Sequence, residues 1–438
     1  MVNYHTTCGT IGLSASTCIT APNHRSQYEN VPDSWELTRV GDVLNLQAGK
    51  FVEAAKIFPD RAPNTYPCYG GNGIRGYVNE FNRDGNYPLI GRQGALCGNL
   101  NYAVGEFFAT EHAVVVECLG GLNPRWAFYF LRIMNLNQYA TATAQPGLSV
   151  KVIDDLVIPV PPLREQERIV TSIESAFAVI DEVEQAKDDL KSAVASAKAK
   201  VLALAISGKL VPQDPNDEPA SALLDRIQSE REQLIKDGKI RRPRATKTTP
   251  ASGDSSHYEN LPFTVPESWT WAKVSDICEP QETKKPSGDF FRYIDIDAID
   301  NRQHRVTEPK LVATTRAPSR AAKGVQSGDT LFSMVRPYLE NIAFVTDDLS
   351  DCIASTGFYV CRPIPAVVSP NYLFRFFVSD YAITGINAFM RGDNSPAIRK
   401  DEMDSFLVPL PPLDEQQRIA SAVESAFTNL DIIISYLN

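Results

Sequence analysis

Residues 159–169 read PVPPLREQERI, and residues 409–419 read PLPPLDEQQRI. The match continues downstream, because ESAF at 174–177 recurs at 424–427. Upstream, VPDSW at 31–35 recurs as VPESW at 265–269. A repeat with a period above two hundred residues indicates duplicated domains rather than a solenoid. The chain is therefore predicted to hold two related units, each followed by a helix.

The segment after each Pro-Pro pair has the pattern of a long helix. Apolar residues alternate by three and four positions, and only Lys187 interrupts the series. This heptad pattern indicates a helix of coiled-coil type. A helix from Arg164 to Ser207 would be about 65 Å long, and Gly208 is placed to cap it. The expected interface residues are Ile169, Ile173, Ile180, Val183, Leu190, Val194 and Val201, with Ile419, Val423 and Leu430 from the second copy.

The expected fold class is mixed α/β, with two similar α/β domains separated by long helices. We expect these helices to pair as an antiparallel coiled coil about a pseudo-twofold axis, although the second helix is only about half as long as the first. The expected parts are an N-terminal extension (1–27), a first unit (28–160), a central long helix, short helix and basic linker (161–256), a second unit (257–410) and a C-terminal helix (411–438).

Short runs of β-branched and aromatic residues indicate strands inside both units. Near the end of each unit the pattern changes to that of a helix, at 125–134 and at 371–378. The expected strands are 87–90 and 113–116 in the first unit, and 291–296, 330–335, 342–345 and 358–361 in the second.

Composition excludes several classes of protein. A chain of 438 residues is too long for one compact domain, and 43% hydrophobic with 22% charged residues excludes global disorder. No stretch approaches 18 consecutive apolar residues, so no membrane-spanning helix is expected, and residues 1–24 do not resemble a secretory signal. The eight cysteines include no Cys-x-x-Cys pair, which indicates neither a zinc site nor a disulfide framework and favours a reducing cytoplasm.

Two segments resemble catalytic motifs without fitting them. GNGIRG at 71–76 has the glycine spacing of a dinucleotide site, but the residues after it look extended rather than helical. Asp300 with EPK at 308–310 resembles a nuclease metal site, but Pro309 fits poorly in a central strand. There is no Walker A motif and no adenine-methyltransferase tetrapeptide. We expect no catalytic residue, no metal and no cofactor on this chain.

Polar, arginine-bearing loops form the candidate ligand-reading surface. Asn and Gln can pair with adenine and Arg with guanine in the major groove, and clustered arginines can neutralise phosphates. The alternative is a set of solvated surface charges, and the net charge of −10 does not by itself favour a nucleic-acid binder. The candidate DNA-binding residues are Tyr69, Asn72, Arg75, Arg92, Gln93, Asn99 and Asn101 in the first unit, and Arg302, His304, Arg305, Arg316, Arg320 and Lys323 in the second.

Three features together resemble the specificity subunit of type I restriction-modification enzymes. They are the PPLxEQ opening of a long helix, its recurrence near residue 410, and GKLVPQ at 208–213 followed by EPASALL at 218–224. The resemblance covers the chain from about residue 28 and implies two target recognition domains, each reading half of a split site in double-stranded DNA. Residues 1–24 have no counterpart in the pattern.

The resemblance also implies partners. Two methyltransferase subunits would dock on the paired helices and hold S-adenosylmethionine, and motor-nuclease subunits would join for restriction in host defence. This chain would then determine which DNA sequence the complex binds, without being an enzyme itself. The alternative hypothesis is a coiled-coil scaffold that does not bind DNA and uses its two divergent units to recognise proteins.

Overall fold

The computed structural model describes residues 28, 31–94, 96–140, 146–236 and 261–437. It divides into two compact units, Met1–Val183 and Glu184–Asn438, whose boundary falls inside one long helix. The expected extension at 1–27 and most of the basic linker lie outside the described residues. Within the part of the chain that is described, no helix combines the length and the apolar character needed to cross a membrane.

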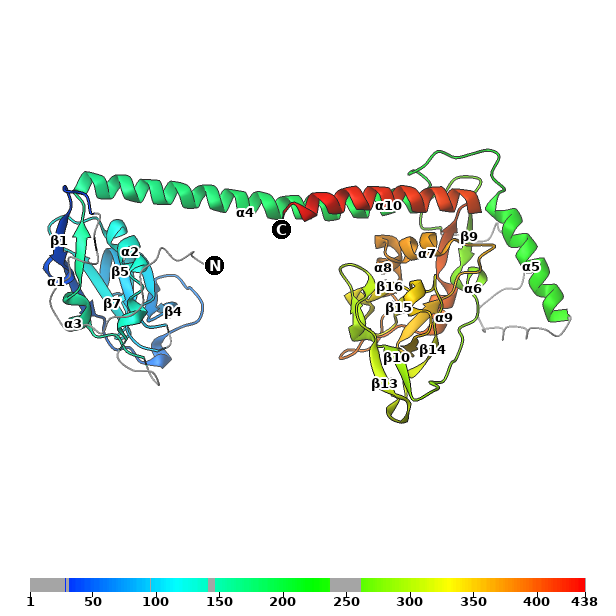
Figure 1. Ribbon diagram of the computed structural model, residues 1–438, viewed down its shortest axis with the longest axis horizontal. Helices are drawn as coiled ribbons and strands as arrows, with labels where there is room; N and C mark the ends of the chain where they lie inside the picture. Colours follow the sequence, from blue (N-terminus) through cyan, green and yellow to red (C-terminus); the bar gives the residue numbers. More distant parts are fainter. Residues whose placement is uncertain (1–27, 29–30, 95, 141–145, 237–260, 438) are drawn as a thin grey trace. The chain divides into compact units, whose positions relative to one another are not determined.

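The first unit is built on a six-stranded sheet in the order β2-β7-β5-β6-β3-β4, with α2 packed against it (Figure 1). A separate ladder pairs β1 with β8 and so brings the VPDSW end of the unit to its Pro-Pro end. The strands are β1 (Glu36–Arg39), β2 (Leu44–Ala48), β3 (Tyr66–Gly70), β4 (Gly73–Val78), β5 (Arg83–Gly91), β6 (Leu100–Ala109), β7 (Ala113–Cys118) and β8 (Val157–Val160). The helices are α1 (Val40–Val43), α2 (Pro124–Ile133) and α3 (Val150–Asp154).

The second unit holds a five-stranded sheet, β11-β12-β16-β15-β18, a four-stranded sheet, β13-β10-β17-β14, and the ladder β19-β9. The strands are β9 (Thr270–Lys273), β10 (Phe290–Ile294), β11 (Ile299–Asp300), β12 (Arg305–Val306), β13 (Lys310–Ala313), β14 (Ala321–Gly324), β15 (Thr330–Ser333), β16 (Ile342–Phe344), β17 (Ile353–Ser355), β18 (Phe358–Cys361) and β19 (Leu407–Leu410). The helices are α5 (Ala220–Lys236), α6 (Val274–Ile277), α7 (Pro370–Phe377), α8 (Asp380–Asn387), α9 (Lys400–Ser405) and α10 (Leu413–Ser435).

The two units share one sheet plan. The strands β7, β5, β6, β3 and β4 correspond in order to β18, β15, β16, β12 and β11. In both units the second strand of this series pairs antiparallel with its two neighbours, and the third and fourth strands pair in parallel. The prediction of two similar α/β domains is confirmed. The pseudo-twofold relation between them stays a prediction.

One hairpin is connected differently in the two units. In the first unit the earlier strand, β3, lies beside β6, whereas in the second the later strand, β12, lies beside β16. The second unit also adds the four-stranded sheet, which has no counterpart in the first. This sheet accommodates the longer interval between Trp and Pro-Pro in the second copy.

The glutamine of the repeated PPLxEQ motif fastens each unit to the helix that follows it. Gln166 donates to the carbonyl of Pro161 and accepts from the backbone N–H of Asn123, the residue before α2. Gln416 accepts from the N–H of Ser369, before α7, and donates to the carbonyls of two residues. Both side chains are buried, at 3% and 0% exposure. A buried amide with fixed backbone partners explains why the motif recurs as a unit.

The predicted long helix is present as α4 (Leu163–Ile206), whose 44 residues correspond to about 66 Å. Gly208 follows it with φ +70°, as a C-terminal glycine cap requires. The helix contributes to the cores of both units, because Val170 is buried in the first and Leu202 and Ile206 are buried in the second.

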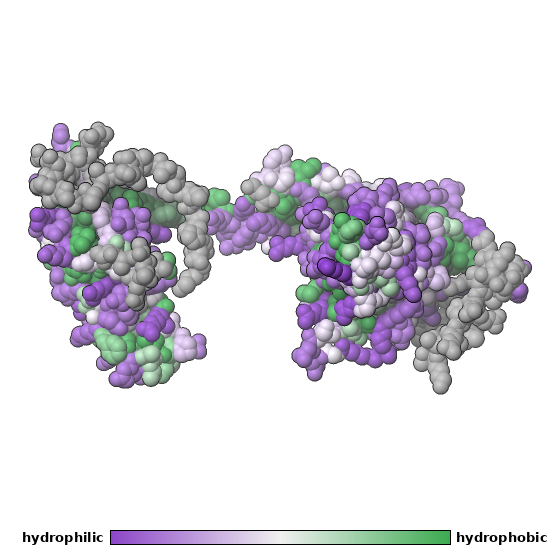
Figure 2. Space-filling view, turned by 60° about the horizontal axis from the view of Figure 1, so that its bottom comes forward, coloured by the Kyte–Doolittle hydropathy of each residue, from purple (hydrophilic) through white to green (hydrophobic). Residues whose placement is uncertain are grey.

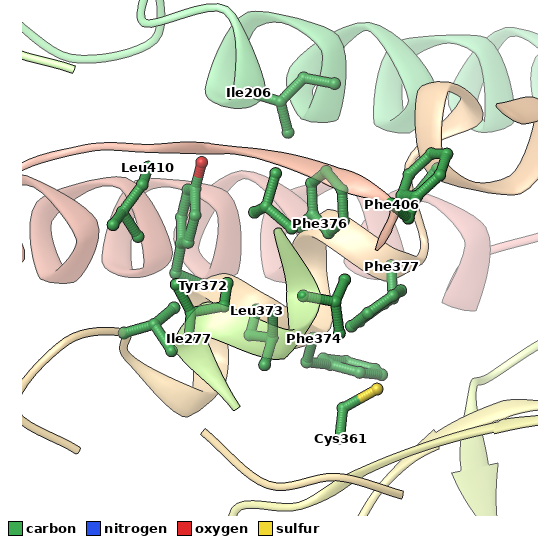
Figure 3. Packing of buried hydrophobic residues seen from close by; sticks show 14 of the residues in the cluster. Ile206, Ile277, Cys361, Tyr372, Leu373, Phe374, Phe376, Phe377, Phe406 and Leu410 are labelled. Atoms are coloured by element: carbon green, nitrogen blue, oxygen red, sulfur yellow. The ribbon is translucent and has the colours of Figure 1, made fainter. Parts of the chain in front are cut away.

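The last part of α4 pairs antiparallel with α10. Lys198 lies 2.5 Å from Asp431, while Gln213, beyond the end of α4, bonds to Glu415 at the start of α10. Ile206 points from α4 toward the aromatic cluster that includes Tyr372 (Figure 3). The predicted antiparallel pairing is confirmed for this stretch. Of the expected interface residues in it, Val194, Ile419 and Val423 are buried, and Val201 and Leu430 are half-buried.

The middle of α4 is exposed. Ile180, Val183 and Leu190 are 44%, 62% and 39% exposed, and α10 ends only four residues after Asp431. Ile169 and Ile173 are half-buried near the start of the helix. The expected seam is therefore covered by the chain itself only near its two ends.

Most expected elements are present, and three strands end earlier than predicted, including the one expected at 342–345, which stops at Phe344. The strand expected at 291–296 stops at Ile294, because Asp295 accepts from the N–H of Ile296 and starts a 3-10 turn. The strand expected at 330–335 stops at Ser333. Three residues later Arg336 has φ +48°, and Pro337 has no N–H to donate to a ladder.

Candidate nucleic-acid interface

In the first unit, the turn between β3 and β4 meets the loop between β5 and β6. Asn99 Nδ2 donates to Asn72 Oδ1 over 2.7 Å. Gly91 permits this approach, since a Cβ there would lie 2.0 Å from the carbonyl oxygen of Gly71. Asn101 is close by, because a Cβ on Gly73 would lie 3.1 Å from its Oδ1. The three predicted asparagines therefore form one cluster.

Backbone pairing presents Arg92 and Gln93 beside this cluster. The N–H of Arg92 donates to the carbonyl of His112, and its own carbonyl accepts from Leu148, both over 2.9 Å. Gln93 forms an isolated β-bridge with Gly147. With its backbone held on both sides, this segment leaves the side chains of Arg92 and Gln93 exposed.

The two remaining candidates of the first unit have different surroundings. Tyr69 is half-buried and packs edge-on against Phe107, with ring centroids 5.5 Å apart, and burial raises the pKa of its hydroxyl. Arg75 is exposed on β4, with its side chain 3.8 Å from the Cβ position of Gly70. Tyr69 is thus placed to support the site and Arg75 to extend it. Asn101 Nδ2 is buried and has no hydrogen-bond partner among the described residues, which is unusual for a buried amide.

In the second unit the predicted basic residues fall into two groups. Arg302, His304 and Arg305 lie at the turn between β11 and β12. This turn contacts the loop after β15, because Asn301 Nδ2 donates to the carbonyl of Leu339 over 2.7 Å. Burial lowers the pKa of His304, whose Nδ1 is buried and has no hydrogen-bond partner in the structure.

The second group lies beside the four-stranded sheet. Arg316 ends a short 3-10 turn, and the carbonyl of Arg320 accepts from Thr356 over 2.8 Å. Both arginine side chains are exposed. Lys323 is half-buried on β14 and bonds to Gln281, and burial together with nearby Lys400 lowers its pKa. The candidates of the second unit, which are close together in the sequence, therefore occupy two places.

The loop at residues 334–340 was not predicted from the sequence and has several exposed residues. Arg336 is exposed there, and Tyr338 and Leu339 are 48% and 40% exposed. On the face drawn in Figure 2, hydrophilic residues predominate and hydrophobic residues form smaller patches on both units. The pair Arg336-Pro337 was the sequence signal for this loop. The prediction of a strand through residue 335 hid that signal.

The two catalytic-motif resemblances have structural explanations. The segment Gly73–Val78 is strand β4, so the glycine-rich sequence forms a hairpin and no helix follows it. Asp300 accepts from the N–H groups of Arg302 and Gln303, and Lys310 pairs with Asp297 over 2.5 Å. Among the described residues, no group of three His, Cys, Asp or Glu side chains is arranged to hold a metal ion.

Replacing Arg316 and Arg320 with Ala is expected to weaken DNA binding and flatten its salt dependence. Each phosphate contact removed lowers the slope of log K against log salt by about one. The measurement is a series of binding titrations at several salt concentrations. Lys310→Ala is a control, because Lys310 already pairs with Asp297. An unchanged slope in the double variant would place both arginines away from the DNA.

Comparison with known proteins gives the family. The profile of the type I restriction modification DNA specificity domain matches residues 32–191 and 266–435. These two matches follow the duplication and together cover well over half of the chain. The chain belongs to this family.

The chain is also similar to individual specificity subunits. The chain is 50% identical over 128 residues to the Escherichia coli type I restriction enzyme EcoprrI specificity subunit, covering 29% of this chain and 32% of that protein. It is 20% identical over 415 residues to the EcoDI specificity subunit, covering 93% and 84%. Among solved structures, the HsdS subunit from Thermoanaerobacter tengcongensis is 38% identical, with a TM-score of 0.37 and coverage of 39% and 45%. The matched region spans about a third to a half of the first curated relatives.

Proposed function

We propose that this chain is the specificity subunit of a type I restriction-modification complex and reads a bipartite site in double-stranded DNA. The observation that carries the proposal is the presence of two units with one sheet plan, each within a family domain for DNA specificity. Each unit offers exposed Arg, Asn or Gln side chains suited to base edges. Two such units on one long helix match a site of two half-sites and a gap.

The methyltransferase and motor-nuclease subunits are the proposed partners. Apolar side chains on the middle turns of α4 support a docking surface there, since Phe177, Val179 and Val183 are 43%, 59% and 62% exposed. We assign S-adenosylmethionine and the methyl-transfer chemistry to the methyltransferase subunits, and place the assembly in the cytoplasm with the DNA. This chain then determines which DNA sequence the complex binds and is not itself an enzyme.

The experiment that tests the proposal is selection from random DNA. The chain is purified with its methyltransferase, and the bound DNA is sequenced. We expect one site made of two fixed half-sites separated by a gap of constant length. Absence of any sequence preference would reject the proposal and favour the scaffold hypothesis, in which the two units recognise proteins.

The purified chain alone is expected to transfer no methyl group. The reason is the proposed division of labour, in which the cofactor is held by the partner. The measurement is transfer of labelled methyl groups to DNA with and without the methyltransferase subunit. Transfer by a preparation shown to be free of that subunit would contradict the assignment.

A further inference from the structure

One loop in each unit is held by the same set of backbone hydrogen bonds. In the first unit the N–H of Gly91 donates to the backbone carbonyl of Asn99 over 2.9 Å. In the second unit the N–H of Ser333 donates to the backbone carbonyl of Asn341 over 3.1 Å. In each unit the N–H of the residue after this donor bonds to the segment just before the neighbouring strand, which is β7 in the first unit and β18 in the second. Seven residues lie between the bonded pair in each unit. These segments are here called the reading loops: residues 92–98, of which residue 95 is not described, and residues 334–340.

A second segment, here called the strap, holds each reading loop from the other side. Gly94 donates to the carbonyl of Pro146 over 2.9 Å, and Arg336 donates to that of Pro396 over 2.7 Å. The hydrogen bond that each strap donates back to its loop is also equivalent in the two units. The same holds for the isolated β-bridge between loop and strap. The straps are residues 146–148 in the first unit and 396–398 in the second.

This bonding fixes a residue-by-residue correspondence between the loops. Position 94 corresponds to position 336, and both residues have a left-handed backbone, with φ +90° at Gly94 and +48° at Arg336. Glycine adopts this conformation easily, whereas arginine does so rarely. Strained residues of this kind concentrate at functional sites. The Arg336 side chain is exposed, and its Nη2 donates to the carbonyl of Asn394 over 3.3 Å.

The next exposed position also matches. Leu96 corresponds to Tyr338, and these large side chains are 56% and 48% exposed. In each unit the turn of the neighbouring hairpin closes on the reading loop or the residue after it, since Asn72 bonds to Asn99, directly after the first loop, and Asn301 bonds to Leu339 within the second. The contact is kept although the hairpin is connected in the opposite order. Each unit thus presents the same loop, strap and turn with different side chains.

We propose that the reading loops are the base-reading elements of the two units, and that Arg336 and Tyr338 read the second half-site. This inference rests on the proposed function. An arginine can pair bidentately with guanine, and a tyrosine or leucine can contact a thymine methyl group or stack on a base. Arg316 and Arg320, between strands β13 and β14 of the separate four-stranded sheet, then contact phosphates.

The correspondence also explains how one fold reads two unlike half-sites. At equivalent positions the first loop carries Arg92, Gln93 and Leu96, where the second carries Met334, Val335 and Tyr338. The backbone is the same, while the groups offered to the DNA differ. The base preference of each unit therefore follows from its own loop, and one loop can be altered without affecting the other unit.

The test uses the complex with the methyltransferase and selection from random DNA. The variants are Arg336→Lys, which keeps the charge but loses the bidentate fork, and Arg336→Gly, which suits the left-handed backbone. We expect each to reduce preference at one base pair by on the order of ten- to a hundredfold. Tyr338→Ala should relax preference at a base pair of the same half-site. Gln93→Ala should relax the other half-site, and Arg316→Ala, the matched control, should weaken all sequences equally.

Two results would overturn the inference. One is an unchanged base preference in Arg336→Lys, Arg336→Gly and Tyr338→Ala. The other is a change of base preference in Arg316→Ala. Arg336→Lys also separates a reading role from a folding role, because its affinity for non-specific DNA should stay close to that of the unaltered complex. If the unaltered complex selects no bipartite site, the proposed function itself fails, which is a distinct outcome.

Discussion

Seven residues inserted after Lys187 are expected to lengthen the preferred gap between half-sites by about three base pairs. Seven residues add about 10.5 Å to an α-helix, and one base pair rises about 3.4 Å. The insertion makes nearly two full turns and so keeps the heptad phase. Its site suits the experiment, because neighbouring Val183 and Leu190 are exposed, while Lys198, further along α4, pairs with Asp431 of α10.

The measurement is binding or methylation on a series of DNA sites that differ only in gap length. The half-site sequences should not change, since both recognition units are untouched. Three base pairs also rotate the second half-site by roughly 100°, which can broaden the preference. The same seven residues appended after Asn438 are the control, because they lengthen the chain but not α4. A variant that keeps the original gap would show that α4 is a tether rather than a ruler.

Gln416→Leu is expected to cost the second unit at least about 3 kcal/mol of local stability. The apolar side chain would leave the N–H of Ser369 and the carbonyls of Val367 and Pro411 without their buried partner. Each buried group left unpaired costs about 1–3 kcal/mol. The damage should centre on the start of α7 and its packing against α10.

Gln166→Leu provides the matched comparison in the first unit. Gln166 has two backbone partners, at Asn123 and Pro161, so the expected cost is smaller, at about 2 kcal/mol. Amide hydrogen exchange of peptides covering α2 and α7 measures both variants, and the unaltered unit of each serves as its internal reference. Equal protection of α7 in Gln416→Leu and in the original chain would show that the motif does not fasten the unit to its helix.

The sequence predicted the parts of the fold that depend on local pattern and repetition. The PPLxEQ motif marked the starts of α4 and α10, and the heptad series predicted α4 to within one residue at each end. Strand 358–361 was also predicted with its observed bounds. These features depend on neighbouring residues, so a single chain is enough to recognise them.

The sequence did not reveal features that depend on distant contacts. The reversed order of β3–β4 and β11–β12 follows from pairing with β6 and β16, which no local pattern specifies. The loop at 334–340 was hidden because Met334 and Val335 extend the apolar run of β15. Counting charges along the sequence grouped Arg302 with Arg320, although the first lies beside the five-stranded sheet and the second beside the four-stranded sheet. Only three-dimensional pairing separates the residues at the turn between β11 and β12 from those beside the four-stranded sheet.

The exposed middle of α4 affects how rigidly this helix, which links the two units, holds its length. Helical turns gain most of their stability from tertiary packing, and a helix without it is marginal in water. The turns around Val183 therefore open more easily than those near Val170 or Leu202, which lie in the cores of the units. Such opening lets the end-to-end distance of the spacer fluctuate in the free chain. Partner subunits that bury these turns would suppress the fluctuation, so a sharply defined gap would be a property of the assembled complex.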